Sequence, residues 1–373
     1  MKKKVFLFAC IEKNIGDDLF IRTVCDRYPH VQFTISSDAN YGSLSKIKNL
    51  SFSRRLKWWT FFTSLEPRTT IRKITKTLGA STLKLLLGKR DVALFIVGNA
   101  FKNFAYRGKY QSEWIKKRLQ LAKKFYLIST NFGPYNDNRW KDNFEEIFPQ
   151  MADVCFRDEY SYQLFEHLSN TRFAPDAILT LGEQQVNGTA PKNVIISIID
   201  CSFNARSEEL RRAAESYESK MIEVAQKFLS EGYRVTLLNS NANQDRPACD
   251  RIISHIDSDN VDVVDYNGEL DVVFDLYRNS SCVVATRLHT IILAWLYRLP
   301  VVPIVYDIKV ENLLNSYHFS ADRFDIKSLD DVSSEDIFEA MRKYDYFLSQ
   351  ETIDSSHLQF KKVDIEFSDF GKY

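Results

Sequence analysis

Two basic side chains interrupt an apolar stretch in the C-terminal half of the chain. In VVATRLHTIILAWL, residues 283–296, Arg287 and His289 lie two positions apart between a strand-like run and a helix-like run. A helix that begins here presents free N–H groups and a partial positive charge beside both side chains. That combination suits a phosphate or a carboxylate, so we predict an anion site. Lys309, after the next apolar run, is expected to add a cation to it. For His289 alone, the alternative is a histidine that only packs in the core.

A second polar group follows the first apolar run. In EKNIGDDLFIRTV, residues 12–24, Gly16 comes soon after that run, and Asp17 is expected to cap the next helix. One interpretation is a plain strand–turn–helix in which both residues serve the turn. The other places Asn14, Gly16 and Asp17 at the mouth of a ligand cleft, where Asp17 accepts a proton from a substrate hydroxyl. The segment lacks G-x-G-x-x-G, so no dinucleotide site is predicted.

Further polar residues end other predicted strands. Gly98 and Asn99 close LFIVGNA, and Gly133 lies in STNFGPY, where glycine at a strand end allows close approach by a ligand. Arg157 ends the run ADVCFR, and it either pairs with a nearby acid or faces an anion. Asp176 in APDA follows the next short strand and is expected to anchor a loop or a ligand.

These residues need a scaffold, and the apolar runs predict one. Short apolar runs separated by helical patterns are typical of parallel sheets covered on both faces. The polar stretch LGEQQVNGTAPKN, 181–193, is predicted to link two Rossmann-like doubly wound α/β domains, with the ligand in the cleft between them at the strand C-termini. We predict domains over 1–182 and 190–330, followed by helices and a tail over 331–373. The predicted strands are Val5–Ile11, Val31–Ile35, Val92–Val97, Phe125–Thr130, Val154–Arg157, Val194–Ile199, Val235–Asn239, Val261–Asp265, Cys282–Ala285 and Val301–Ile304.

Charge is unevenly distributed in the 373 residues, although the formal net charge is only +1. Between Lys46 and Arg90 there are twelve Lys and Arg residues and one acid, Glu66. The six cysteines are scattered without a C-x-x-C pair, so neither disulfides nor a zinc site is indicated, and no metal is expected. No 18-residue apolar stretch and no convincing signal peptide are present, which predicts a cytoplasmic protein.

Taken in order, these motifs resemble the polysaccharide pyruvyl transferase family. The matching pieces are NIGDDLF, IVGNA, STNFGPY, FRDEYS, APDA and TRLHTIILAW followed by LPVVPIVYDIK, and they span roughly residues 5–320. The R-x-H block is the most specific of them. This chain departs from the family in the short VGNA loop, where the family commonly has more glycine, and in 46–90, which matches no family motif.

The resemblance implies a fold similar to GT-B glycosyltransferases and transfer of a pyruvyl group from phosphoenolpyruvate to a sugar, giving a pyruvate ketal and phosphate. It implies donor binding by Arg157, Arg287 and His289, with no further cofactor. We expect the two arginines to clamp the anions and His289 to act as general acid or to donate to the leaving phosphate. Asp17 is the expected base.

Two rival functions fit the same scaffold. A nucleotide-sugar glycosyltransferase would share the cleft and the phosphate site, and would need an acid such as Glu311 to hold a ribose. A non-catalytic saccharide-assembly protein would have no use for the basic residues.

Segment 46–90, which contains LKWWTFFTSL, has two interpretations. One is peripheral docking on an anionic membrane that carries a lipid-linked acceptor, and the other is a helical hairpin packed on the sheet. No nucleic-acid-binding module accompanies the patch.

Overall fold

The computed structural model of this chain describes residues 4–37, 40–53, 90–98, 101–103, 112, 115–116, 118–119, 121–186, 192–204 and 206–368. The chain divides into two compact units. Unit 1 comprises Met1–Ile11, Phe20–Thr180 and Ser355–Tyr373, and unit 2 comprises Glu12–Leu19 and Leu181–Asp354. Most of the predicted membrane-docking segment 46–90, and also Asn99, lie outside the described residues.

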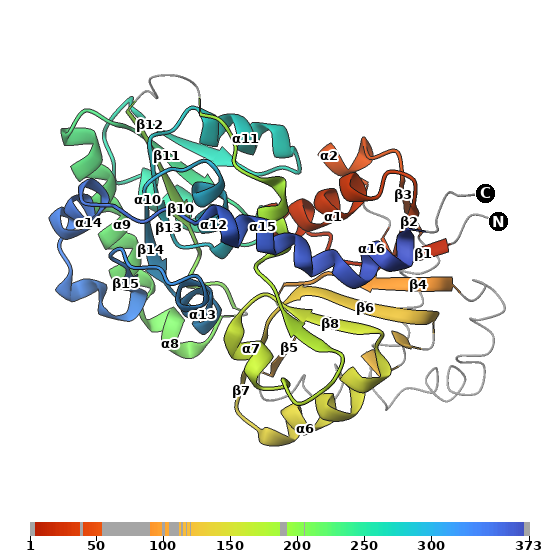
Figure 1. Ribbon diagram of the computed structural model, residues 1–373. Coiled ribbons are helices and arrows are strands. Elements are labelled where there is room, and N and C mark those ends of the chain that lie inside the picture. Colours follow the sequence, from red (N-terminus) through yellow and green to blue (C-terminus); the bar gives the residue numbers. More distant parts are fainter. Residues whose placement is uncertain are drawn as a thin grey trace, which may run out of the picture. The chain divides into compact units, whose positions relative to one another are not determined.

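Unit 1 is built on a seven-stranded parallel sheet in the order β3-β2-β1-β4-β6-β8-β9 (Figure 1). Its central strands are apolar on both faces, as parallel strands covered by helices must be. A separate parallel pair, β5 and β7, follows the C-terminal ends of β4 and β6 along the chain. The strands are β1 Lys4–Phe8, β2 Gln32–Ile35, β3 Leu50–Phe52, β4 Arg90–Phe95, β5 Phe101–Asn103, β6 Ala122–Thr130, β7 Phe132–Tyr135, β8 Asp153–Phe156 and β9 Thr171–Phe173.

Helices cover both faces of this sheet. On one face, α6 and the short helix that follows it contribute to an aromatic core in which Phe132, Phe144 and Phe148 meet edge to face or tilted. On the other face lies the C-terminal α16, whose Phe367 packs edge to face on Tyr28 with ring centroids 4.8 Å apart. The helices of unit 1 are α1 Ile15–Arg27, α2 Gly42–Ser45, α6 Asn138–Ile147, η1 Phe148–Gln150, α7 Glu159–Gln163, η2 Ala177–Leu181, η4 His357–Phe360 and α16 Lys361–Phe367; the first turn of α1 and the end of η2 belong to unit 2.

The C-terminal region 331–373, predicted as helices and a tail, is thus divided between the units. Its last helix is held to unit 1 by polar contacts as well as by packing. Asp364 accepts a bond from the Tyr28 hydroxyl at 2.7 Å and pairs with Arg27 at 2.7 Å. Gln359 is fully buried, and its amide donates to the carbonyls of Phe156 at 3.0 Å and Ala174 at 2.6 Å.

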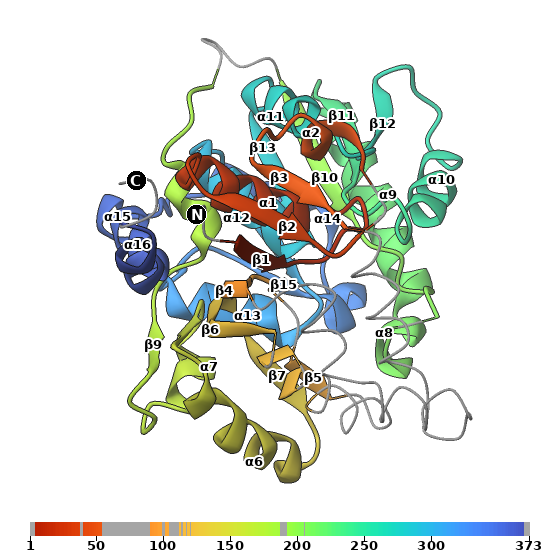
Figure 2. The ribbon, with the colours of Figure 1, turned by 90° about the vertical axis from the view of Figure 1, so that its right-hand side faces the viewer.

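Unit 2 is a six-stranded parallel sheet in the order β12-β11-β10-β13-β14-β15. Helices α9 and α10 lie on one side of its strands, and α11 and α12 lie on the other (Figures 1 and 2). The strands are β10 Asn193–Ile198, β11 Arg234–Asn239, β12 Val261–Asp265, β13 Cys282–Ala285, β14 Val301–Val305 and β15 Phe324–Asp325. The helices are α8 Glu208–Arg212, α9 Ala214–Ser230, α10 Arg246–Ile253, α11 Leu270–Arg278, α12 Leu288–Leu296, α13 Ile308–Ser316, η3 Ile326–Asp331, α14 Ser334–Arg342 and α15 Gln350–Ser356.

All ten predicted strands are present within a few residues of their expected bounds, and the two large sheets also contain strands that were not predicted. The sheets gain β3 and β9 in unit 1 and β15 in unit 2, all at sheet edges. These strands are two or three residues long and partly exposed, so they leave no apolar run in the sequence. Among the described residues, no helix has the length and apolar character needed to span a membrane.

Candidate active site

The predicted strand-to-helix junction lies at the C-terminal edge of the sheet in unit 2. Strand β13 ends at Ala285, Arg287 occupies the N-cap position, and α12 begins at Leu288, so the helix expected near His289 is confirmed. Thr286 is fully buried between them, with its hydroxyl 3.0 Å from that of Tyr217. The apolar residues of β13 and α12 are buried, which fixes the polar residues between them at the sheet edge.

A buried carboxylate orients Arg287. Nε of Arg287 donates to Oδ2 of Asp245 at 2.9 Å, and Nη2 donates to the same oxygen. The other oxygen of Asp245 accepts from the backbone N–H of Asp200 at 3.0 Å. Asp245 is fully buried, whereas 12% of the Arg287 side chain is exposed. Burial acts to lower the pKa of Arg287, but the charge of Asp245 holds that pKa above its ordinary value. Arg287 is therefore a fixed cation.

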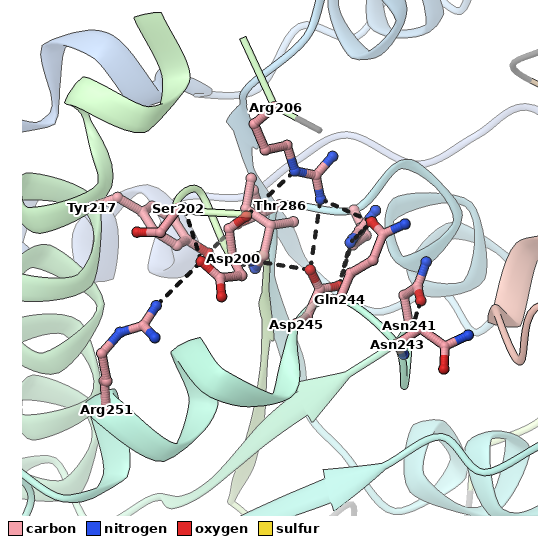
Figure 3. A network of polar contacts seen from close by, with 12 residues as sticks. Asp200, Ser202, Arg206, Tyr217, Asn241, Asn243, Gln244, Asp245, Arg251 and Thr286 are labelled. Atoms are coloured by element: carbon pink, nitrogen blue, oxygen red, sulfur yellow. Dashed lines mark hydrogen bonds and ion pairs between the residues drawn. The ribbon is translucent and has the colours of Figure 1, made fainter. Parts of the chain in front are cut away.

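A second guanidinium, from Arg206, shares this carboxylate and was not predicted from the sequence. Nη2 of Arg206 lies 3.6 Å from Oδ1 of Asp245 and 3.4 Å from Oε1 of Gln244 (Figure 3). The same Gln244 oxygen lies 3.5 Å from Nη2 of Arg287. Nε of Arg206 donates to the backbone carbonyl of Asp200 at 3.4 Å. Two cations on one buried carboxylate leave a net positive charge.

Lys309 and Tyr306 add to the same cluster. Nζ of Lys309 lies 5.1 Å from the centre of the Tyr306 ring, and Cζ of Arg206 lies 5.7 Å from it. Burial raises the pKa of Tyr306, but the charges of Lys309, Arg287 and Arg206 outweigh this and lower it to about 8. The structure thus gathers three cations around one phenol, including Lys309 and Arg287 from the predicted anion site. We call Arg206, Arg287 and Lys309, which surround Tyr306, the cation cluster.

The segment Glu12–Leu19 belongs to unit 2 and lies against His289. The backbone N–H of Ile15 donates to the carbonyl of Ser240 at 3.1 Å, and Asn14 forms a β-bridge with Asn241. A Cβ atom built on Gly16 would lie only 1.8 Å from Nδ1 of His289, so the glycine backbone lies directly on the imidazole.

The prediction that Asp17 caps this helix is wrong. Helix α1 begins at Ile15, and the side chain of Asn14 accepts from the N–H of Gly16 at 2.9 Å, which is the contact a capping residue makes. Asp17 therefore lies inside the first turn, next to the glycine that touches His289. The neighbouring Asp18 is fully buried and accepts from the Tyr266 hydroxyl at 2.5 Å.

Other predicted residues converge in unit 1. Arg157, 2% exposed, donates to Asp176 at 2.8 Å and to the carbonyl of Gly98 and the side chain of Asn131, each at 3.0 Å. A Cβ on Gly98 would lie 2.8 Å from both terminal nitrogens of Arg157. Of the two interpretations offered for Arg157, the pairing with a nearby acid is thus present. Gly133, two residues after Asn131, has a φ of +90°, a conformation that glycine adopts without strain.

Within the described ranges, no group of three His, Cys, Asp or Glu side chains converges as metal ligands would. The cysteines are free thiols, and all but Cys10 are buried. Unit 2 presents fixed cations, an imidazole, a phenol and a first-turn carboxylate at this sheet edge.

Solved structures of UDP-N-acetylglucosamine 2-epimerases resemble this chain in fold. UDP-N-acetylglucosamine 2-epimerase from Rickettsia bellii aligns with a TM-score of 0.57 and 10% identity over 99% of this chain and 97% of its own. The epimerase from Neisseria meningitidis, bound to UDP-GlcNAc, aligns with a TM-score of 0.57 and 10% identity over 98% of this chain and 100% of its own. The epimerase from Methanocaldococcus jannaschii aligns with a TM-score of 0.54 and 9% identity over 97% of this chain and 100% of its own. Such identities establish the fold alone. With the two parallel α/β units they confirm the predicted GT-B-like class.

Sequence comparison identifies the family. The chain matches no curated protein. The profile described as polysaccharide pyruvyl transferase matches residues 14–308, more than half of the chain. The matched range contains every predicted site residue except Lys309, which follows it directly. This chain therefore belongs to the polysaccharide pyruvyl transferase family.

Proposed function

We propose that this chain transfers the pyruvyl group of phosphoenolpyruvate to two hydroxyls of one sugar, forming a cyclic ketal and releasing phosphate. The observation that carries the proposal is the cation cluster in unit 2. Phosphoenolpyruvate brings a phosphate and a carboxylate close together, and two guanidinium groups beside an ammonium are suited to that pair of anions. Membership of the polysaccharide pyruvyl transferase family supports the same type of reaction.

In this proposal Arg287 binds the donor with the edge that Asp245 leaves free. The carboxylate of Asp245 takes Nε and Nη2, so the guanidinium is held in one orientation before the donor arrives. Such preorganisation avoids reorienting the charge during the reaction. His289 lies two residues further on, with the backbone of Gly16 fixing one side of its ring. Arg157, with Asp176 and Gly98, is proposed to act on the donor as well.

The reaction balances with two proton transfers. A proton reaches the methylene carbon of the donor, and C2 becomes an oxocarbenium-like centre that the first sugar hydroxyl attacks. The second hydroxyl attacks the same carbon as the C–O bond to phosphate breaks. The two sugar hydroxyls release one proton each. One of these replaces the proton delivered to the methylene carbon, and the other leaves with phosphate. We assign proton donation to His289, either to carbon or to the leaving phosphate, and proton acceptance to Asp17.

The acceptor is proposed to be a saccharide precursor of a cell-surface or exopolysaccharide, carried on a lipid at the cytoplasmic side of a membrane. Segment 46–90, which has twelve basic residues and one acidic residue, is proposed to dock on anionic lipid. Flotation with phosphatidylglycerol vesicles tests this, with phosphatidylcholine vesicles as the control. Equal recovery with both kinds of vesicle rejects the docking proposal.

A nucleotide-sugar transferase is the second candidate, because an epimerase of the same fold is bound to UDP-GlcNAc. One contact counts against it in this chain. Glu311, the acid expected to hold a ribose, pairs with Arg323 at 2.7 Å. Isothermal calorimetry with phosphoenolpyruvate and with UDP-GlcNAc distinguishes the two, since only the true donor should bind tightly.

The activity test uses phosphate release from phosphoenolpyruvate with a panel of lipid-linked oligosaccharides, and mass spectrometry of the saccharide product. Arg287→Ala and His289→Ala should each lose most of the release. Arg278→Ala, which removes an exposed guanidinium paired with Asp275 on α11, is the control and should keep it. Full activity in both site variants rejects the assignment.

A further inference from the structure

The phenol of Tyr306 has no role in the reaction proposed above. Tyr306 directly follows the last residue of β14, at the same sheet edge as Arg287, and only 8% of it is exposed. Buried tyrosines ordinarily remain neutral well above physiological pH, because burial disfavours the phenolate. The surroundings of Tyr306 oppose this tendency.

Charged groups from three connections face this phenol. Lys309 comes from the first turn of α13, Arg287 from the β13–α12 junction and Arg206 from the segment after β10. Two acids lie among these groups: Asp307, the N-cap of α13, and the buried Asp245, which pairs with Arg287 and Arg206. Three cations against two carboxylates leave a net positive charge, which favours an anion beside them, including a phenolate.

We propose that, at alkaline pH, Tyr306 takes up a proton from solvent when a dianion enters the cation cluster. Without a ligand at alkaline pH, the phenolate partly neutralises Arg206, Arg287 and Lys309. When a phosphate-like dianion takes its place beside the cations, the phenolate is repelled, takes up one proton and donates its O–H to the anion. The inference rests on the proposed function in one respect, which is that phosphoenolpyruvate is the physiological dianion.

Affinity of the cation cluster for a dianion should fall as the pH rises above the pKa of Tyr306. Burial raises the pKa of Tyr306 and the three cations lower it, to about 8 in the free protein. A bound dianion weakens the effect of the cations, so the pKa in the complex is higher. Below pH 8 the phenol already carries its proton, and affinity for a dianion is independent of this group. Above it, binding must take up one proton, and affinity falls about tenfold for each further pH unit.

Sulfate is the appropriate probe, because it remains a dianion throughout the neutral and alkaline range. Ultraviolet difference spectra of the full chain should show one tyrosinate forming near pH 8, and sulfate should shift that step to higher pH. Tyr306→Phe should lose the step and bind sulfate with no proton uptake. Tyr297→Phe, which removes another buried phenol of unit 2, is the matched control and should retain both.

A second variant keeps the test decisive if Tyr306→Phe folds poorly. Lys309→Gln removes the strongest cation acting on the phenol, so its tyrosinate step should move to higher pH. Other described tyrosines should not ionise in the same pH range, because burial raises their pKa. These are Tyr28, Tyr126, Tyr160, Tyr217, Tyr233, Tyr277, Tyr297, Tyr344 and Tyr346.

The proposal is overturned if the wild-type chain shows no tyrosinate step near pH 8, or if the step persists in Tyr306→Phe. It is also overturned if sulfate affinity is the same on both sides of that pH. A parallel titration with phosphoenolpyruvate separates this inference from the proposed function. If sulfate binding takes up a proton at Tyr306 but phosphoenolpyruvate binds no better than sulfate, the proton exchange stands and the donor assignment fails.

Discussion

The contact between Gly16 and His289 predicts that a single methyl group will disturb the site. In Gly16→Ala the new Cβ would lie 1.8 Å from Nδ1, 2.2 Å from Cε1 and 2.5 Å from Cγ of the imidazole. Real Cβ contacts are essentially never shorter than 3.0 Å, so the ring must move by about 1.2 Å. Gly16 is not among the glycines with positive φ, and the backbone itself therefore accepts alanine.

The expected cost has two parts. Forcing a side chain out of a packed site costs about 1–3 kcal/mol of unfolding free energy. A catalytic group displaced by about 1 Å loses about 100-fold in rate. Urea denaturation measures the first quantity, and phosphate release from phosphoenolpyruvate in the presence of acceptor measures the second.

A double-mutant cycle isolates the contact. His289→Ala removes the ring atoms that the new methyl group would strike, so Gly16→Ala should cost almost nothing in that background. The coupling free energy should therefore approach the whole cost of the single variant. If Gly16→Ala destabilises both backgrounds equally, or leaves wild-type activity unchanged, the proposed positioning of His289 by this glycine is wrong.

Two further variants test the contacts that hold the other predicted residues. Gly98→Ala places a Cβ 2.8 Å from both terminal nitrogens of Arg157, and should lower the unfolding free energy by about 1–3 kcal/mol in urea, because that guanidinium is fixed by three acceptors. An unchanged midpoint would contradict this. Asp245→Asn weakens the buried pair with Arg287 and should cost about 3–5 kcal/mol in the same measurement, whereas Asp250→Asn, on an exposed pair, should cost about 0–1 kcal/mol. Equal losses would show that burial of Asp245 is unimportant.

The fold was predictable where parallel strands are buried on both faces, because such strands leave continuous apolar runs. Strands β12 and β13 have the expected bounds, and the others differ by a few residues. The edge strands were not predictable, since two or three half-exposed residues carry no periodicity. Nor does any local pattern reveal that Glu12–Leu19 packs with unit 2, because that depends on contacts with residues more than 200 positions away.

The candidate site was predictable in part. Arg287 and His289 stand out because polar residues interrupt an apolar stretch at the start of a helix. Asp245 was missed, although Pro247 in the first turn of α10 marks a helix start that a carboxylate would precede. Arg206 and Tyr306 were missed for a different reason. Each looks like an ordinary loop residue in the sequence, and only the convergence of β10, β13 and β14 at one sheet edge brings them together.

Calorimetric titration of the full chain with phosphoenolpyruvate tests the central claim most directly, since it requires no knowledge of the acceptor. We predict that phosphoenolpyruvate binds more tightly than either sulfate or UDP-GlcNAc. Arg287→Ala should weaken that binding by a factor of ten or more, corresponding to about 1.4 kcal/mol, while Arg278→Ala should leave it unchanged. Tighter binding of UDP-GlcNAc, or equal phosphoenolpyruvate affinity in wild type and Arg287→Ala, would contradict the assignment of the cation cluster as the donor site.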